Sequence, residues 1–213
     1  MSLQFELDQI SNELVKGTPL EAMQAMEQSI KEVQEEGLVT GLTEGVKAKD
    51  FTLVNHLGET IHLYEELEKG PVILTFYRGS WCPYCNRQLK AYQEIMPDIQ
   101  ELGAQLFAIS PQTPDHSLSL TEKHDLAFQV LSDTRGIVSA KYNILFEVPD
   151  YLKHAYKTMG LDLEGYNGKD NSILPVPATF MIDETGEIRF SHVNPNYMTR
   201  LEPSELLRAL RKL

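Results

Sequence analysis

Apolar residues in the first 36 positions recur every three or four residues, which is the spacing of one face of an α-helix. They fall into two stretches, Leu3–Leu14 and Leu20–Val33, separated by a Gly-Thr-Pro sequence. Thr18 is the predicted N-cap of the second helix, Pro19 is its predicted first residue, and Gly37 is expected to end it. The pattern predicts two amphipathic helices that pack on the rest of the chain or, in a homodimer, on a second copy.

From about residue 41 the pattern changes to short apolar runs that alternate with helical stretches. The runs 51–54 and 60–63 flank a loop that contains glycine, and they predict a β-hairpin. The nearly continuous apolar runs 72–77 and 105–110 are typical of central strands buried on both faces. The other predicted elements are helices over 83–102, 115–126, 136–142 and 204–212, a strand over 128–131, and a strand pair over 178–182 and 187–191.

An irregular insertion interrupts this alternation over residues 146–174, with one predicted helix at 151–159 and then the turn-rich sequence GYNGKDNS. The order of the other elements predicts an α/β fold with a mixed central sheet flanked by helices. The sequence shows no internal repeat, low-complexity tract or linker. We therefore expect an N-terminal helical extension over residues 1–40 and one α/β domain over residues 41–213.

Charge and composition narrow the classes of function. The chain of 213 residues has 31 Asp and Glu against 19 Lys and Arg, a net charge of -12. Phosphate groups would repel such a chain, so we expect no nucleic-acid partner and no membrane partner. No apolar run reaches the roughly 18 residues of a membrane span, and the acidic N-terminus lacks the features of a secretory signal. These observations predict a cytoplasmic protein.

The chain has two cysteines, Cys82 and Cys85, in the sequence WCPYC between the predicted strand 72–77 and the predicted helix 83–102. A Cys-x-x-Cys pair at such a junction is typical of a redox site. Cys82 falls at the helix N-terminus, where unpaired N–H groups and the helix dipole can lower a thiol pKa from about 8.5 to roughly 3.5–7.5. Cys85 lies on the same side one turn deeper, where it can attack an oxidised Cys82.

Neighbouring residues are candidates to support this chemistry. Arg78 and Arg87 are cations that would further stabilise a thiolate. Pro83 suits the first helical turn, where its missing N–H would be unpaired in any case. Trp81 is expected to lie beside the reactive sulfur.

Two other interpretations of the cysteine pair stay open. Zinc needs four ligands and the chain has no second cysteine pair, which disfavours a zinc site within one chain but leaves one shared across a dimer. Two buried structural thiols are the other alternative, disfavoured by the junction and by the flanking Trp81 and Arg78. No flavin, haem or nucleotide motif is present, so we expect no cofactor and no metal.

Longer segments around the motif resemble a known family. FYRGSWCPYCNRQL, LGAQLFAISPQ, LSDTRGIVSAKYNI and PATFMIDETGEIRF are similar to the AhpC/TSA peroxiredoxin-like group of the thioredoxin superfamily, over about residues 45–211. The resemblance implies a thioredoxin-like fold, with Cys82 as the peroxidatic cysteine and Cys85 as its resolving partner. It also implies that a thioredoxin- or glutaredoxin-type reductant recycles the disulfide.

The resemblance further implies a cis peptide bond between Val176 and Pro177, at the start of the strand that faces the active cysteine. The Val176 backbone would then point toward the Cys82 sulfur and could pair with an incoming disulfide-bearing chain. The alternative is a trans proline that begins a strand, a common place for proline.

Three positions depart from the family pattern. The Thr or Ser three residues before the peroxidatic cysteine is Gly79, the Pro seven residues before it is Thr75, and the Arg expected in the later strand is Pro177. Ser80, Arg78 and Arg87 are the candidates to replace these groups. These departures count against fast peroxide reduction more than against redox chemistry at the cysteine pair.

Three functions follow. In the first, Cys82 reduces a peroxide and a Cys82–Cys85 disulfide forms. In the second, the pair exchanges with protein or small-molecule disulfides, as CPYC and Pro177 suggest. In the third, the chain is a redox-sensing interaction protein whose N-terminal helices and 146–174 insertion contact a partner.

Overall fold

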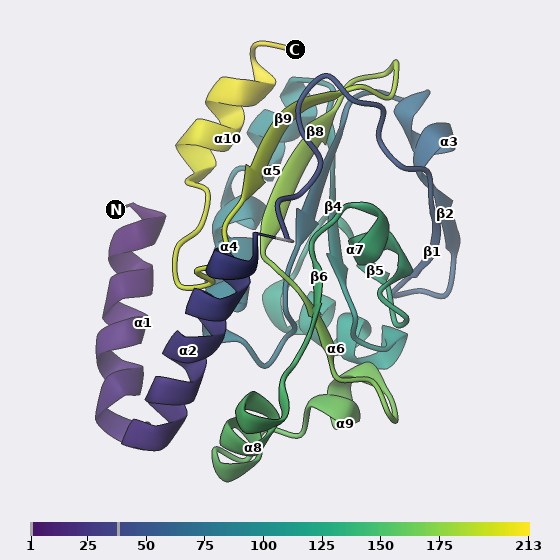
Figure 1. The fold of residues 1–213 in the computed structure, drawn as a ribbon. Coiled ribbons are helices and arrows are strands. Elements are labelled where there is room, and N and C mark those ends of the chain that lie inside the picture. The colour runs from purple at the N-terminus through teal and green to yellow at the C-terminus, as the bar shows by residue number, and fades with distance from the viewer. Residues whose placement is uncertain (1, 38) are drawn as a thin grey trace.

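The computed structural model describes residues 2–37 and 39–213; Met1 and Leu38, both in the predicted N-terminal extension, lie outside the described residues. A seven-stranded mixed sheet with strand order β2-β1-β5-β4-β3-β8-β9 forms the centre of the fold (Figure 1). Its strands are β1 (Thr52–Asn55), β2 (Thr60–His62), β3 (Val72–Phe76), β4 (Gln105–Ser110), β5 (Gln129–Ser132), β8 (Ala178–Ile182) and β9 (Ile188–Val193). β3, β4 and β5 run parallel, and the other neighbours are antiparallel. The predicted α/β fold is confirmed.

Strand β3 has side chains in two apolar cores, because successive side chains of a strand point to opposite faces. Ile73 belongs to a core that helices α4, α5, α6 and α10 cover, whereas Val72 and Leu74 belong to a core on the other face, covered by α3 and α7. These helices are α3 (Leu63–Leu67), α4 (Pro83–Glu94), α5 (Met96–Glu101), α6 (Pro114–His124), α7 (Ile137–Lys141) and α10 (Pro203–Leu210). Burial on both faces explains the continuous apolar run of β3.

Two predictions about helix boundaries are wrong. The helix expected over 83–102 is two helices, because Pro97 has no N–H and its ring would clash with the carbonyl of residue 93, so the chain breaks at Ile95. Thr18 does not cap the second N-terminal helix; its hydroxyl donates to the Leu14 carbonyl and closes the first one, and Pro19, the expected first residue, is instead the N-cap of the second.

The insertion is more regular than its sequence suggests. Short strands β6 (Leu145–Glu147) and β7 (Ile173–Pro175) pair antiparallel and close its two ends together. The predicted helix is confirmed as α8 (Asp150–Thr158), and a further short helix, α9 (Leu163–Asn167), takes up the start of the expected loop. Strands of three residues carry too little periodicity to be recognised in the sequence.

The N-terminal residues form the two expected helices, α1 (Leu3–Gly17) and α2 (Leu20–Glu36), which a short turn joins into a helical hairpin beside the sheet domain (Figure 1). Gly37 ends α2 in a left-handed conformation, as predicted, with φ at 62°. Helix α1 packs against α4 and α2 packs against α8. Within the described ranges, no helix has the length and apolar character needed to cross a membrane.

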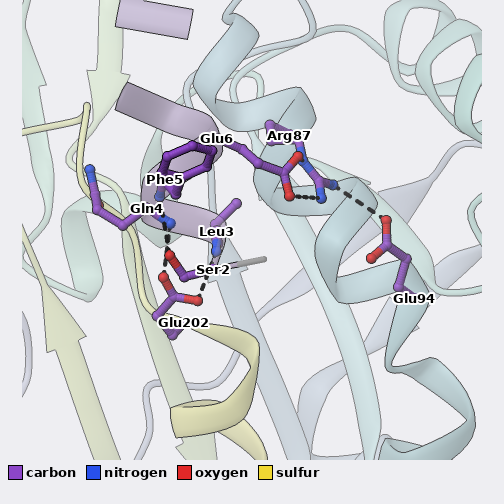
Figure 2. Close-up of polar contacts among 8 residues, drawn as sticks. All are labelled: Ser2, Leu3, Gln4, Phe5, Glu6, Arg87, Glu94 and Glu202. Carbon is purple, nitrogen blue, oxygen red and sulfur yellow. Dashed lines mark hydrogen bonds and ion pairs between the residues drawn. The ribbon is translucent and has the colours of Figure 1, made fainter. Parts of the chain in front are cut away.

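Polar contacts fix the start of α1 to the domain (Figure 2). The Glu202 carboxylate accepts hydrogen bonds from the backbone N–H groups of Leu3 and Gln4, at 3.0 and 2.8 Å. Glu6, one turn on, forms a two-contact ion pair with Arg87 of α4, and this hydrogen bond lowers the pKa of Glu6. A carboxylate at a helix N-terminus satisfies free N–H groups and interacts well with the helix dipole.

We expect Glu202→Ala to loosen the start of α1, at a cost of about 1 kcal/mol, the usual effect of losing a helix cap. Amide hydrogen exchange should speed up in the first turns of α1 and stay slow in β3. The control is Glu205→Ala. This change removes an exposed carboxylate of α10 that pairs with Arg208, also in α10. Equal exchange in the two variants would show that Glu202 does not hold the helix.

Candidate active site

The cysteine motif occupies the loop that leads from β3 into α4, as predicted. Cys82 is the N-cap of α4 and Pro83 is its first residue. Gly79 in this loop has no room for a side chain, because a Cβ atom there would lie 2.3 Å from Nε1 of Trp81. Ser80 is tied into the loop, since its N–H and its hydroxyl both donate to Oε1 of Gln112, at 2.5 and 2.7 Å. Gly79 is therefore fixed by the position of Trp81.

Both cysteines are free thiols and both are buried, with 1% of Cys82 and none of Cys85 exposed. The Cys85 sulfur accepts two hydrogen bonds, from the backbone N–H of Arg78 and from Nη2 of Arg200, each at 3.4 Å. The Cys82 sulfur lies 3.9 Å from Nη1 of Arg78. Two guanidinium groups therefore face the cysteine pair.

Arg78 is buried among aromatic rings as well as beside sulfur. Its guanidinium lies over the rings of Tyr197 and Trp81, at 3.8 and 4.8 Å from their centroids, and donates to the Tyr156 hydroxyl. Tyr156 comes from α8, so the insertion helps to hold the site. Aromatic faces attract a cation, most strongly where water is excluded.

Arg200 reaches the site from the segment between β9 and α10. Tyr92 of α4 fixes this segment by donating to the Leu201 carbonyl at 3.1 Å, and Arg200 itself donates to the Thr199 carbonyl. Within residues 2–37 and 39–213, neither Arg78 nor Arg200 forms an ion pair with a carboxylate. A buried cation needs a counter-charge, and a thiolate of the cysteine pair is the group in place to supply it.

The pKa values of the two cysteines shift in opposite directions. Burial acts to raise the pKa of Cys85, but the hydrogen bond from Cys82 and the charges of Arg200 and Arg78 outweigh it, so this pKa lies well below its usual value. Burial and the neighbouring Cys85 raise the pKa of Cys82. The contacts favour the same sulfur, because Cys85 has two donors at 3.4 Å whereas Cys82 has one at 3.9 Å. The sequence placed the thiolate on Cys82 because the helix N-terminus is visible in sequence, whereas Arg200 reaches Cys85 only through tertiary packing.

A cavity of about 400 Å3 opens beside Cys82. Trp81, Pro83 and Tyr84 line it on the domain side together with Cys82, whereas Cys85 is not among its lining residues. A molecule that enters the cavity therefore meets Cys82 first. In the described part of the chain, no three His, Cys, Asp or Glu side chains are grouped to hold a metal ion.

The structure separates Arg87 from the cysteines. Its side chain is paired with Glu6 on α1 and lies 3.5 Å from Glu94, with no contact to either sulfur. Arg200, Tyr156 and Tyr197 are site residues that the sequence analysis did not assign. Tyr197 and Arg200 lie in a segment that resembles the same peroxiredoxin-like group, but no residue spacing assigned a chemical role to any of the three.

The predicted cis bond before Pro177 is wrong, because every peptide bond in the described ranges is trans. Pro177 directly precedes β8, where a missing N–H costs no sheet hydrogen bond. The Val176 N–H donates to the Ile144 carbonyl at 2.7 Å and the Pro177 carbonyl accepts from Asn194 at 3.2 Å. Val176 and Pro177 do lie near the site, in the lining of a small cavity that also includes Arg78.

Comparison with solved structures shows the fold. The chain matches peroxidoxin BcpB from Mycobacterium tuberculosis with a TM-score of 0.63 and 20% identity, over 81% of this chain and 98% of that one. It matches peroxiredoxin 6 of Arenicola marina with a TM-score of 0.65 and 17% identity, over 80% and 73% of the two chains. The thioredoxin-like fold implied by the sequence resemblance is confirmed.

Sequence comparison gives the family. The thiol-disulfide oxidoreductase ResA of Geobacillus kaustophilus is 26% identical over 151 residues, which cover 70% of this chain and 69% of that protein. A bcp peroxiredoxin homologue of Coxiella burnetii is 27% identical over 144 residues, 68% of this chain and 83% of that one. The model of the AhpC/TSA family matches residues 45–191. The chain therefore belongs to the AhpC/TSA family, within the thioredoxin superfamily, and is a thiol-dependent oxidoreductase.

Proposed function

We propose that the chain is a thiol peroxidase that reduces peroxides through Cys82 and forms a Cys82–Cys85 disulfide. The observation that carries the proposal is a buried cysteine pair with Cys82 at the wall of a cavity. Two guanidinium groups that have no carboxylate partner among the described residues face this pair. These cations keep one thiolate in the pair, and a thiolate is the form that attacks a peroxide.

The resting pair holds one proton, on Cys82, and one negative charge, on Cys85. The proton first passes from Cys82 to the neighbouring Cys85 sulfur. The Cys82 thiolate then attacks the terminal oxygen of the peroxide, the O–O bond breaks, and Cys82 becomes a sulfenic acid. The alkoxide or hydroxide that leaves takes the proton from Cys85 and departs as an alcohol or as water.

Cys85 is a thiolate again once it has given its proton to the leaving group, and this thiolate carries out the second step. It attacks the Cys82 sulfur, an S–S bond forms, and hydroxide leaves and takes up a proton from solvent. In sum, one peroxide is reduced and the dithiol is oxidised to a disulfide. A thioredoxin- or glutaredoxin-type dithiol returns the pair to the reduced state, and a reducing cytoplasm would keep it so.

Members of the family carry an arginine at the position that Pro177 occupies in this chain. Arg78 replaces that arginine in the proposed reaction. Its Nη1 lies 3.9 Å from the Cys82 sulfur, next to the oxygen on which negative charge develops as the O–O bond breaks. Fixed positive groups at such a place lower the barrier in a site shielded from water. The Thr or Ser of the family has no counterpart, because Trp81 fills the space beside Gly79.

A second candidate is thiol–disulfide exchange, in which Cys82 attacks a sulfur of a substrate disulfide. The observation that favours it is the name thiol-disulfide oxidoreductase ResA borne by several relatives, such as those of Geobacillus kaustophilus and Bacillus thuringiensis. A mixed disulfide forms on Cys82, and Cys85 then displaces the substrate thiolate.

The first experiment is stopped-flow oxidation of the wild-type dithiol by hydrogen peroxide, followed by the fluorescence of Trp81. We expect a second-order rate constant orders of magnitude above that of a free thiolate, because Arg78 faces the reacting oxygen. Cys82→Ser should not react, and Cys85→Ser should accumulate a sulfenic acid that dimedone traps. A rate close to that of a free thiol would contradict the peroxidase.

The exchange reaction makes a separate prediction for Cys85→Ser. If disulfides are substrates, incubation with a small aromatic disulfide should leave a stable mixed disulfide on Cys82, visible as a mass increase of one substrate thiol. The resolving sulfur is absent in this variant, so the adduct cannot be displaced. Absence of the adduct at a pH where Cys82 is ionised would count against exchange.

The next prediction concerns the Arg200 guanidinium. This group stabilises the Cys85 thiolate, so Arg200→Gln should raise the pKa of the pair by about 1–2 units, the usual effect of one nearby opposite charge. Below the new pKa, the reaction with peroxide should slow about tenfold for each unit of the rise. The pKa is measured by thiolate absorbance near 240 nm.

Two variants test the Arg200 prediction. Arg200→Lys should recover part of the shift, because it keeps the charge. Arg87→Gln should leave the thiol pKa unchanged, since Arg87 pairs with Glu6 away from the sulfurs. A shift in Arg87→Gln as large as that in Arg200→Gln would show that the effect is not specific to the contact with Cys85.

A further inference from the structure

The α1–α2 hairpin forms one wall of the cavity through which Cys82 is reached. Leu14 of α1 and Met23, Met26 and Ile30 of α2 line this cavity together with residues of the sheet domain. With the hairpin in this position, 1% of Cys82 is exposed. The hairpin ends before residue 45, where the family match begins. The wall over Cys82 therefore lies outside the part of the chain that matches the family.

The two reactants of the proposed cycle differ in size. A small peroxide fits a cavity of about 400 Å3, which lies within the roughly 300–1,000 Å3 of small-molecule sites. A thioredoxin-type dithiol is carried by a folded protein, and its sulfur must touch the Cys82 sulfur to break the disulfide. A folded protein does not fit into a cavity of this size. Recycling by such a protein therefore requires the hairpin to move away from Cys82.

The packing of the hairpin is compatible with such a movement. Helix α1 has 15 residues and α2 has 17, yet the buried residues are only Leu3 and Leu7 in α1 and Ala22 and Ser29 in α2. Segments with few buried apolar contacts open at a smaller free-energy cost than the core of a domain. Over Cys82, moreover, the cavity separates the hairpin from the domain. The hairpin can therefore open while the sheet domain stays folded.

Polar contacts on both helices hold the hairpin closed (Figure 2 shows those of α1). Glu202 accepts hydrogen bonds from the first turn of α1, and Arg87 of α4 pairs with Glu6 of α1. Tyr151 of α8 donates a hydrogen bond to Glu32 of α2. The chain that follows α2 joins the hairpin to the domain, so a swing of the hairpin about this end would break these contacts.

We propose that the α1–α2 hairpin is a gate. It is closed in this structure, where small oxidants reach Cys82 through the cavity, and it must swing off the domain before a protein dithiol can reduce the Cys82–Cys85 disulfide. The proposal rests on the proposed function for its two reactants. It assigns a part to the hairpin in the reductive half of the cycle only.

The reductive step that the gate controls is a thiol–disulfide exchange. With the hairpin open, a thiolate of the partner attacks the Cys82 sulfur, the Cys82–Cys85 bond breaks, and Cys85 leaves as a thiolate. The second thiol of the partner then attacks the partner's own sulfur, displaces Cys82 and gives it a proton. The partner becomes a disulfide, and the cysteine pair gains two electrons and returns to one thiol and one thiolate.

The test measures how fast the Cys82–Cys85 disulfide is reduced by reduced thioredoxin and by dithiothreitol, and takes the ratio of the two rate constants. The disulfide is formed with diamide, so the assay needs no peroxidase activity. Glu202→Ala removes an anchor of the closed hairpin and raises the open fraction. The ratio should therefore rise about fivefold, which corresponds to the roughly 1 kcal/mol of a lost helix cap. Dithiothreitol enters with the hairpin closed, so its own rate should stay within twofold.

The matched control is Glu205→Ala, which removes an exposed carboxylate that pairs with Arg208 within α10. Its ratio should stay within twofold of wild type. Arg87→Gln removes the ion pair with Glu6 and should also raise the ratio, by a smaller factor because this pair is partly exposed. Equal ratios in all three variants would overturn the gate.

Hydrogen exchange tests the movement itself. The Cys85→Ser protein is joined through Cys82 either to thioredoxin whose resolving cysteine is replaced by serine, or to 2-mercaptoethanol. Amides of α1 should exchange at least tenfold faster in the thioredoxin adduct than in the small adduct, whereas amides of β3 should be equally slow in both. The gate is wrong if α1 is equally protected in the two adducts, or if the small adduct forms and the thioredoxin adduct does not.

These assays separate the gate from the proposed function. Slow reaction with hydrogen peroxide, combined with a ratio that rises in Glu202→Ala but not in Glu205→Ala, overturns the peroxidase and supports the gate. Fast reaction with hydrogen peroxide, combined with the same ratio in every variant, supports the peroxidase and overturns the gate.

Discussion

Two buried guanidinium groups held against a pair of thiols are the constraint on which the rest of this site depends. Removing a cation from water costs several kcal/mol even after the protein relaxes, and neither Arg78 nor Arg200 has a carboxylate partner within the described residues. The rings of Trp81 and Tyr197 offset part of this cost for Arg78. The remainder calls for an anion, and the cysteine pair supplies one by losing a proton.

This charge balance links the redox state of the cysteines to the stability of their surroundings. The dithiol can carry one negative charge, whereas a Cys82–Cys85 disulfide carries none and leaves both arginines without a counter-charge. The arrangement therefore stabilises the reduced pair relative to the disulfide, which makes the disulfide a stronger oxidant and easier to reduce. In the proposed reaction, the same cations therefore favour both attack on the substrate and return to the resting state.

Three segments distant in sequence must meet for the site to form. The loop after β3 and the first turn of α4 carry Arg78 and the cysteines, the insertion brings Tyr156, and the segment before α10 brings Arg200. The N-terminal hairpin adds a wall to the cavity over Cys82. Its contacts to Glu202 and Arg87 join it to α10 and α4 (Figure 2), so the cover over the site is anchored on the elements that build the site.

The amino-acid sequence by itself determined the fold class, the order of most elements and the identity of the cysteine pair. Continuous apolar runs, helical periodicity and a Cys-x-x-Cys sequence at a strand–helix junction are local signals, and local signals can be read from the chain. Tertiary structure alone decided that the Cys85 sulfur accepts two hydrogen bonds and that Arg200 rather than Arg87 provides one of them. It also decided that the bond before Pro177 is trans. These features depend on contacts between residues up to 115 positions apart, such as Arg200 and Cys85, and no local pattern records them.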